Sequence, residues 1–510
     1  MPESARTWIG YVAMCVGMFM AILDIQVVAS SLTTIQSALH IPRDQLSWIQ
    51  TAYLMAEIIA IPLTAMLTRA LSLRWLFALA TVGFTLASFA CAFAPDANVL
   101  IAIRVTQGFC GGMLIPSVFT SVFTLLPPER EILGTTIAGV FAMIAPTLGP
   151  AVGGYLTETF SWHWIFLINV FPGVVVSALV ALCVRAEKPD FGVFRHIAYG
   201  TVVLASVFLA SLELLLKEAP QRHWSGEFVW VLIAICPITG LLAVYSCLAR
   251  RHPFIDLRKF RNVSFAVGSG LSFVLGAGLY GATYLLAIYL GLVRYHSALE
   301  IGEIMMVAGA VQLLAAPLAA YAEKRFDARI LIFIGYGLFA AGLIANGFAT
   351  FHTDFGGLFW PQVLRGLSVM LCLLPATRLA LDGWPKAQLP DASAQFNLMR
   401  NLGGAIGIAG IDTILDQRTA GHASALIKRL QAGDPLAAKI VGLPAKMFHN
   451  TAMAPVDEAT REMIAPMVKR AALVQSFNEA WLAIGILFVL SLLALPLLRG
   501  TRIKPAANQS

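Results

Sequence analysis

Charged residues are scarce in this sequence. Asp, Glu, Lys and Arg make up 12% of its 510 residues, about half the share found in soluble globular domains. A soluble protein with so few charges could not cover its surface with polar groups. The composition therefore excludes an ordinary soluble enzyme or binding domain.

The sequence also lacks the patterns that mark catalytic and metal sites. Its seven cysteines form no CxxC pair and are interpreted as small apolar core residues rather than as a disulfide framework. Its nine histidines fall in loops or at the edges of apolar runs. No P-loop, HExxH or GxSxG string occurs, so we expect neither an enzyme with catalytic residues nor a metal site.

Long uncharged runs dominate the chain instead. Apolar residues make up 58% of it, and the ranges 75–94, 262–293, 330–351 and 480–498 contain no Asp, Glu, Lys or Arg. A helix needs about 20 apolar residues to cross the hydrocarbon core of a membrane, whereas barrel strands are much shorter. The sequence therefore predicts an all-α protein that crosses a membrane many times.

Apolar runs separated by charged residues, proline or glycine predict fourteen transmembrane helices. Their approximate limits are 8–31, 47–67, 74–94, 98–119, 134–156, 164–184, 197–216, 228–248, 264–290, 301–321, 329–350, 356–380, 397–415 and 479–498. The first run lacks the small-residue cleavage site of a secretory signal, so we expect it to remain in the mature protein. Residues 416–478, between the last two helices, are expected to form helical pieces near the outer surface.

Basic residues predict the orientation of these helices. With the N-terminus in the cytoplasm, the short inner segments hold twenty Lys and Arg, whereas the short outer loops hold only Arg43, Lys217, Arg222 and Arg294. Membrane proteins carry such an excess in their cytoplasmic loops. An even number of helices then places both termini in the cytoplasm. The net charge of +7 follows from this topology and indicates no nucleic-acid partner.

The fifth predicted helix carries the most specific motif. It reads Ala-Pro-Thr-Leu-Gly-Pro-Ala-Val-Gly-Gly from residue 145. Gly149 and Gly153 lie on one face and allow a second helix to approach closely, while Pro146 and Pro150 favour a bend. With Gly154 at its end, the string resembles the antiporter signature of the major facilitator superfamily.

Other segments extend this resemblance. Arg104 opens the string Arg-Val-Thr-Gln-Gly, which includes Gln107 and Gly108 and is similar to the arginine motif of the superfamily. Three further segments match the family: the Leu-Asp pair ending at Asp24, the opening of the second helix at 48–53 and the opening of the thirteenth helix at 396–404. With its fourteen predicted helices, the chain resembles the drug:proton antiporters of the EmrB/QacA type over nearly its whole length.

The resemblance implies a fold and a function. Two six-helix bundles, 1–190 and 261–510, would flank two inserted helices in 191–260, with the long extracytoplasmic loop at 416–478. The protein would export amphiphilic drugs or toxic compounds across the bacterial inner membrane by alternating access. A proton gradient would drive export without a cofactor. Beyond membrane lipid and substrate, the implied partners are a periplasmic adaptor and an outer-membrane channel, with the long loop as a candidate docking surface.

One motif of the superfamily is altered. The loop between the second and third helices usually carries a glycine, an aspartate and a basic pair. Here residues 65–74 contain no acidic residue, and Arg69 stands near the place of the aspartate. The resemblance therefore does not predict the usual ion pair at this point.

The sequence shows traces of an internal repeat. Arg365-Gly366 lies in the twelfth predicted helix as Arg104 lies in the fourth, and glycines at 403, 404, 407 and 410 mark the thirteenth as glycines mark the fifth. If the seventh and eighth helices are an insertion, these positions correspond between two halves. The substrate would then bind near the membrane midplane between the halves.

Three charged residues lie deep within spans of the first half: Asp24, Glu57 and Arg104. A charge there costs about 2.5–3.5 kcal/mol on insertion scales, so such residues are usually functional or paired. Asp24 and Arg104 both fall in the outer half of their helices, and they could meet if the first and fourth helices both line the cavity, as the resemblance implies. Asp24 and Glu57 are candidate proton carriers or cation-binding carboxylates. The alternative is a structural ion pair that fixes the packing of the helices.

The second half supplies further candidates, many near helix ends where long side chains can reach water. They are Glu303, Arg365, Asn397, Arg400, Asn401 and Asp412. Glu213, in the seventh predicted helix, is interpreted as an interfacial charge. Four aromatic residues are candidates for lining an apolar drug cavity: Phe19, Tyr53, Phe119 and Tyr284.

Two alternatives to drug export remain open at this stage. The chain could carry one specific metabolite, or take up a nutrient, although the antiporter signature argues against uptake. It could also be a non-catalytic membrane component of a multi-protein export assembly. The substrate itself leaves no short motif, because many helices contribute to the lining of such a cavity.

Overall fold

The computed structural model describes residues 3–41, 48–185, 189–192, 199–250, 255–443 and 458–498. Within these ranges the chain is helical and contains no β-strand. The helices before residue 185 are α1 (Glu3–Leu39), α3 (Trp48–Leu71), α4 (Leu73–Cys91), α5 (Ala97–Leu125), α6 (Glu131–Thr159), α7 (Trp164–Leu167) and α8 (Val170–Cys183). We refer to them together as the first bundle.

Two helices separate the first bundle from the second, namely α9 (Tyr199–Gln221) and α10 (Glu227–Ala249). The second bundle comprises α11 (Val263–Tyr289), α12 (Ala298–Arg325), α13 (Ala328–Asn346), α14 (Phe355–Leu381), α15 (Leu389–Gln431) and α17 (Glu458–Ser491). The short helix α16 (Pro435–Val441) lies between the last two of these.

The two bundles repeat one packing pattern. In the first bundle α1 packs against α6 and α8, and α5 packs against both α3 and α4. In the second bundle α11 packs against α15 and α17 in the same way, and α14 packs against both α12 and α13. Each bundle has its own apolar core. This confirms the predicted fold class of two six-helix bundles with two additional helices.

The bundles meet along two junctions. At the first, α6 packs directly against α12. At the second, α3 packs against α15, and the inserted helix α9 contacts both of them. We call these the α6/α12 junction and the α3/α15 junction. Any movement of one bundle relative to the other must change the contacts along both.

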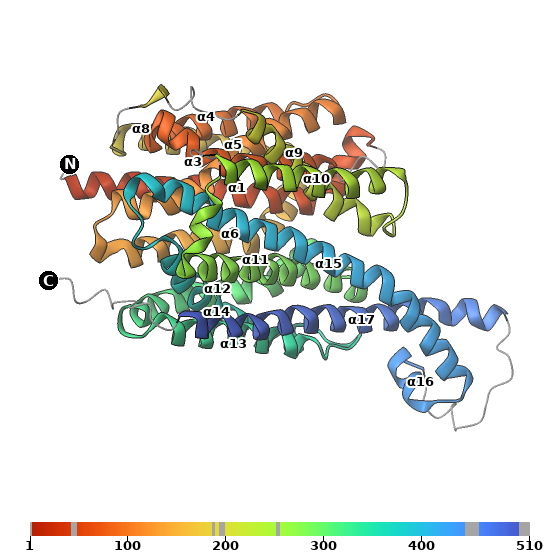
Figure 1. Ribbon diagram of the computed structural model, residues 1–510. Helices are drawn as coiled ribbons and strands as arrows, with labels where there is room; N and C mark the ends of the chain where they lie inside the picture. Colours follow the sequence, from red (N-terminus) through yellow and green to blue (C-terminus); the bar gives the residue numbers. More distant parts are fainter. Residues whose placement is uncertain are drawn as a thin grey trace.

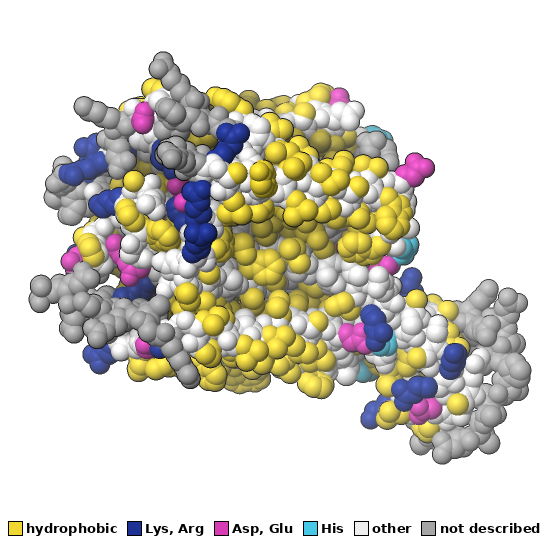
Figure 2. Space-filling model, in the orientation of Figure 1, with side chains coloured by type: hydrophobic (Ala, Val, Ile, Leu, Met, Phe, Trp, Pro, Cys, Tyr) yellow, Lys and Arg dark blue, Asp and Glu magenta, His cyan; other side chains and the backbone are white. Residues whose placement is uncertain are grey.

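The surface agrees with a membrane environment. Twelve of the described helices are long and apolar enough to cross a membrane. The count is thirteen if the bent pair of segments Pro128–Pro146 and Ala151–Thr159, which includes α6, forms one span. Figure 2 shows hydrophobic side chains over the middle of the molecule and charged side chains mostly toward its ends. The chain is therefore a multi-pass membrane protein. Because predicted helix 397–415 lies within the less apolar α15, the count of fourteen spans stays a prediction.

Figure 1 shows that α1 begins and α17 ends at the same end of the molecule, which we call the proximal end. At the opposite, distal end, α15 and α17 extend beyond the other helices and carry α16 with them. The expectation of helical pieces in 416–478 agrees with the described residues, which form the end of α15, all of α16 and the start of α17. The segment after 415 is rich in helix-forming Ala, Leu, Lys, Arg and Gln, so α15 continues to Gln431.

We call these extensions of α15 and α17, together with α16, the distal hairpin. The distal hairpin has a small apolar core of its own. Leu426 and Leu430 of α15, Ala438 and Val441 around α16, and Val468 of α17 are buried against one another. Because this core is separate from those of the two bundles, the distal hairpin is a distinct feature of the surface.

An ion pair joins the bundles at the proximal end. Arg69, in the last turn of α3, lies 2.5 Å from Asp391 in the first turn of α15. Lys259 lies 3.8 Å from the same carboxylate. Asp391 is also well placed at the N-terminal, positive end of its helix. The residue that breaks the family pattern therefore does form a charge contact, with an acidic partner more than 300 positions away in sequence.

The Arg69–Asp391 contact predicts a shift in the balance between conformations. The pair is partly exposed, so it should contribute up to about 1 kcal/mol to the state in which the proximal ends touch. Asp391→Asn is expected to increase the population with separated proximal ends about fivefold. Spin labels at the exposed residues Glu129 and Lys324 would show this increase as a longer distance between the labels, measured by pulsed electron–electron double resonance.

Arg69→Lys is the matched control for this measurement, because it retains the charge, and it should keep the wild-type distance distribution. An unchanged distribution in both Asp391→Asn and Arg69→Ala would show that the contact does not stabilise this state.

Candidate functional site

Asp24 of α1 is buried at the centre of a polar network. The residue is 1% exposed. One carboxylate oxygen lies 2.5 Å from Nη1 of Arg104, and the other accepts hydrogen bonds from Nε2 of Gln107 at 3.0 Å and from Nδ2 of Asn169 at 2.8 Å. A buried charge is tolerated only when it is paired and hydrogen-bonded. The three donors meet this requirement for the ionised form of Asp24.

Arg104 of α5 is held from several sides. It is fully buried, donates from Nε to the backbone carbonyl of Ile49 at 3.2 Å, and donates from Nη1 to Oε1 of Gln107 at 2.7 Å. Its guanidinium lies 4.3 Å from the ring centroid of Tyr53, close enough for a cation–π interaction. The predicted meeting of Asp24 with Arg104 is thus present. Tyr53, a sequence candidate for a drug cavity, instead packs on this arginine.

The arginine motif also determines how closely two helices pack. A Cβ atom at Gly108 would collide with the backbone carbonyl of Tyr53 in α3. Gln107, one residue earlier, donates to Oγ of Ser88 in α4 at 2.8 Å. The glycine therefore allows the close contact between α5 and α3, in which Arg104 of α5 also donates to the backbone of α3 at Ile49.

Asn169 completes the network and was not singled out by the sequence. It lies between α7 and α8, where the helix is interrupted. Pro172 provides a reason for the interruption, because its ring clashes with the carbonyl of the residue four positions earlier. The only available signal was a polar residue three positions before a proline in an otherwise apolar span. Sequence alone gave no indication that this amide would reach Asp24.

Glu57 of α3 forms the second buried carboxylate of the first bundle. It is 5% exposed and accepts a hydrogen bond from Nδ2 of Asn401 in α15 at 3.3 Å. Its other oxygen, Oε2, is buried without a hydrogen-bond partner in the described part of the chain. Glu57 therefore lies at the α3/α15 junction, and a residue of each bundle takes part in the contact.

The two arginines of the second bundle are buried away from acidic groups. Arg365 donates to Gln362 at 2.8 Å and its guanidinium lies 5.8 Å from the ring of Phe339. Arg400 donates to Asn397, and its guanidinium lies 5.1 Å from the ring of Phe119 in the first bundle. Among the described residues, no carboxylate lies within ion-pairing distance of either. Arg365 thus resembles Arg104 in position but not in charge pairing.

The remaining candidates of the second bundle are not brought together. The hydroxyl group of Tyr284 in α11 donates to Asp412 of α15 at 2.5 Å. Glu303 is exposed on α12. Asp412 thus belongs to a contact between α11 and α15, and Glu303 is not part of the network around Asp24.

The antiporter motif packs α6 against α1 and bends α6. Side chains at Gly149 and Gly153 would collide with Gln26 and Ser30 of α1. The two parts of α6 are inclined by 50°, at the prolines predicted to favour a bend. Gly154 is also buried, whereas the side chain of Pro150 lies outside the described residues.

A small cavity of ≈ 50 Å³ lies where the bundles meet. It is lined by Pro146 of α6, Tyr280 of α11, Gln312 of α12 and Arg365 of α14, among other residues. Nε2 of Gln312 and Nε of Arg365 are buried without an acceptor in the described part of the chain. The antiporter motif therefore borders a space between the two halves, where a transported molecule is expected to bind.

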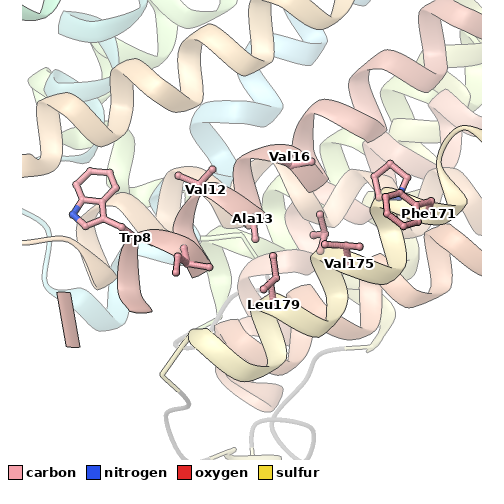
Figure 3. A pocket seen from close by; sticks show the side chains of 10 residues that line it. Trp8, Val12, Ala13, Val16, Phe171, Val175 and Leu179 are labelled. Carbon is pink, nitrogen blue, oxygen red and sulfur yellow. The ribbon is translucent and has the colours of Figure 1, made fainter. Parts of the chain in front are cut away.

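A larger groove of ≈ 560 Å³ has a different character. Figure 3 shows side chains of α1 and α8 around it, including Trp8, Val16, Phe171 and Leu179. Its lining residues are apolar or aromatic, and Phe171 is 79% exposed. The groove therefore belongs to the apolar outer surface rather than to the contact between the bundles.

Phe19 of α1, a candidate from the sequence for lining a drug cavity, packs edge-on against Phe141 of α6, with the ring centroids 6.0 Å apart.

The polar groups therefore form two sites with different chemistry. Around Asp24 every charge has a partner, so a proton that neutralises the carboxylate would release Arg104 from its ion pair. Around Glu57 one carboxylate oxygen has no donor among the described residues, so this residue can accept a proton or a cation without breaking a hydrogen bond seen there. Both sites lie on helices whose packing would change if the bundles moved.

Comparison with known proteins agrees with this architecture. Residues 14–408 match the family model described as Major Facilitator Superfamily. The colistin resistance protein EmrB of Acinetobacter baumannii is 36% identical over 416 residues, which are 81% of each chain. The multidrug export protein EmrB of Escherichia coli is 28% identical over 96% of this chain and 94% of its own.

A solved structure supports the fold alone. The proton:xylose symporter XylE, bound to 6-bromo-6-deoxy-D-glucose, superposes with a TM-score of 0.61 at 13% identity, over 96% of this chain and 95% of its own. With this fold and these relatives, the chain belongs to the major facilitator superfamily, in the EmrB-type family of drug:proton antiporters, and its function is the export of drugs.

Proposed function

We propose that drug export by this protein is driven by protons that bind at Asp24 and Glu57. The observation that carries the proposal is the fully buried ion pair between Asp24 and Arg104, with two further donors on the same carboxylate. The additional donors make the ionised state well satisfied, so protonation must rearrange four side chains at once.

The rearrangement gives a route from proton binding to movement. When Asp24 is neutral, Arg104 loses its counter-charge, and a buried unpaired cation is strongly unfavourable. To stabilise the unpaired charge of Arg104, α5 must shift relative to α1, or water must enter the site. Because α5 packs against α3 through Gly108, such a shift reaches Glu57 and the α3/α15 junction. Rocking of the two bundles about their junctions would then alternate access to the cavity between them.

The orientation follows from the basic residues. We propose that the proximal end faces the cytoplasm of a bacterium and that the protein lies in the inner membrane. Twenty Lys and Arg in the short segments of this side, against four on the other, support this topology. A proton that enters from the distal side then gains about 2.3 kcal/mol per 100 mV of membrane potential.

The substrates we propose are amphiphilic compounds. Relatives of this chain are named for colistin resistance, multidrug export and fatty acid resistance. These names cover molecules that combine apolar and polar parts. The cavity between the bundles matches such molecules in type, because Leu279 and Val369 line it beside Arg365 and Gln312.

The distal hairpin supports a second part of the proposal, a partner protein on the outer side. Its exposed surface includes Leu436, 59% exposed, and Met463, 71% exposed. We propose that a periplasmic adaptor connected to an outer-membrane channel docks here.

Removal of the distal hairpin, with α15 and α17 joined by a short linker, should leave drug transport in proteoliposomes intact but abolish drug resistance in cells.

The first test of proton coupling concerns Asp24. In proteoliposomes, Asp24→Asn should reduce dye transport driven by a pH gradient to the rate of passive leak, because Asn cannot exchange a proton. Breaking a buried pair from one side costs about 3–5 kcal/mol, so this variant could unfold. The double variant Asp24→Asn/Arg104→Gln removes both charges and should fold, but it should still fail to couple.

The double variant separates coupling from structure. If it transports dye at the wild-type rate with the same dependence on the pH gradient, the buried pair is structural and the proposed mechanism is wrong. Glu129→Gln, at an exposed position of the proximal end, is the control and should behave as wild type.

Asn169 should affect transport as a positioning residue. Asn169→Ala removes one of the three donors to Asp24, which costs about 1–3 kcal/mol. We expect the transport rate to fall about tenfold and its pH profile to shift, with little change in the apparent affinity for the drug. Ser177→Ala, which removes a hydroxyl group on α8 that bonds only locally, is the matched control. A pH profile identical to that of wild type in Asn169→Ala would contradict the assignment.

A further inference from the structure

The two junctions between the bundles are not equivalent. At the α6/α12 junction the helices pack directly, whereas at the α3/α15 junction α9 contacts both partners. The repeat of the two bundles gives no reason for this difference, since α3 and α15 correspond to α12 and α6. The inserted helix α9 is therefore the element that makes the second junction different.

Apolar packing fixes the proximal half of α9 in this junction. Leu209 of α9 is buried with Ile58 and Ile61 of α3 and Leu398 of α15. Past the distal end of α9, Nε1 of Trp224 donates to Thr413 of α15 at 3.3 Å. The helix is thus held along its length rather than resting loosely on the outside of the bundles.

The register of α9 places a carboxylate opposite Glu57. Leu209, Glu213 and Lys217 follow one another at intervals of four residues and lie on one face of the helix. Lys217 donates to Oγ1 of Thr51, near the start of α3, while Leu209 packs beside Ile61 further along α3. The two helices run in opposite directions, so Glu213 lies between these contacts, at the level of Glu57.

The charges around this point do not cancel. Glu57 and Glu213 interact electrostatically with each other, and Glu213 with Lys217. Lys217 also interacts with Glu218, whose charge is balanced by its ion pair with Arg222. The carboxylates of Glu57 and Glu213 and the ammonium group of Lys217 therefore leave a net charge of −1 when all three are ionised. Arg104 also acts on Glu57 but is paired with Asp24. Tyr280 of α11 faces the same region as a neutral group, and Asn401 of α15 contributes only an amide.

We propose that α9 completes a cation site at the α3/α15 junction, in which Glu57 and Glu213 together bind either one proton or the cationic group of one amphiphilic substrate. Oε2 of Glu57, buried and without a donor among the described residues, is the free acceptor of this site. This inference rests on the proposed proton-driven export and gives Glu213 a different role from the interfacial charge expected from the sequence.

The exchange step is balanced in charge and in atoms. With one proton on the pair, the site is neutral. A monovalent organic cation that enters displaces this proton to the solution and leaves the site neutral again. One positive charge leaves for each one that arrives, so the site exchanges cargo for a proton directly. Lys217 keeps the total charge at a value that one monovalent ion can compensate.

The experiment measures cation binding and proton release on the purified full-length protein in detergent. Tetraphenylphosphonium is titrated by calorimetry in buffers of different protonation enthalpy. Wild type should release about one proton for each bound cation. Glu213→Gln should raise the Kd about tenfold or more, because a neighbouring opposite charge is lost, and should abolish proton release. Glu213→Asp should keep the Kd and the proton release close to those of wild type. A purely structural role of the side-chain volume would not explain this result.

The matched control is Glu218→Gln on the same helix. Glu218 is buried and forms an ion pair with Arg222, so its removal tests the general effect of losing a carboxylate from α9. It should leave both the Kd and proton release as in wild type. Melting temperatures of all variants in the same detergent separate loss of the site from loss of the fold.

The outcomes distinguish this inference from the proposed function. If Glu213→Gln keeps the wild-type Kd and proton release while Glu57→Gln loses both, α9 takes no part in the site and the inference is overturned. If Glu213→Gln melts like wild type and loses both, the inference stands. Absence of transport driven by a pH gradient in wild-type proteoliposomes would instead overturn the proposed function.

Discussion

In the low dielectric of a membrane interior, a buried charge must be paired and hydrogen-bonded. The structure depends on how this constraint is met. At Asp24 it is met by Arg104 as counter-ion and by two amide donors from separate elements. The helices that supply these groups cannot move independently while the carboxylate is ionised. The polar network therefore fixes the packing of the first bundle, and in the proposed mechanism it makes this packing sensitive to one proton.

The second bundle is built on the same helix pattern but with different chemistry. Arg365 and Arg400 are buried against aromatic rings and amides, without a carboxylate at ion-pairing distance in the described residues. The halves thus differ in their buried groups: the first bundle holds the buried carboxylates Asp24 and Glu57, and the second supplies cationic and amide groups near the space between the bundles. Glu57 and Asn401 connect the two across the α3/α15 junction.

The two junctions show how an insertion can add to a transporter without disturbing its repeat. The α6/α12 junction retains the direct contact, with the antiporter glycines and prolines close by. The α3/α15 junction includes α9, held by apolar packing at Leu209 and by polar contacts at Lys217 and Trp224. The Arg69–Asp391 pair then joins α3 to α15 at the proximal end. Relative movement of the bundles must break or slide each of these contacts.

The sequence by itself determined the membrane class and the helical fold, and it singled out Asp24 and Arg104 as charges inside membrane spans. The physical reason is that uncharged runs of about 20 residues and charges placed inside them are local properties of the chain. Tertiary structure decided the rest. The roles of Asn169 and Asp391 and the position of Glu213 depend on contacts between residues far apart in sequence. No local pattern encodes which helix face meets which neighbour, so only the packing of α9 and α15 could show them.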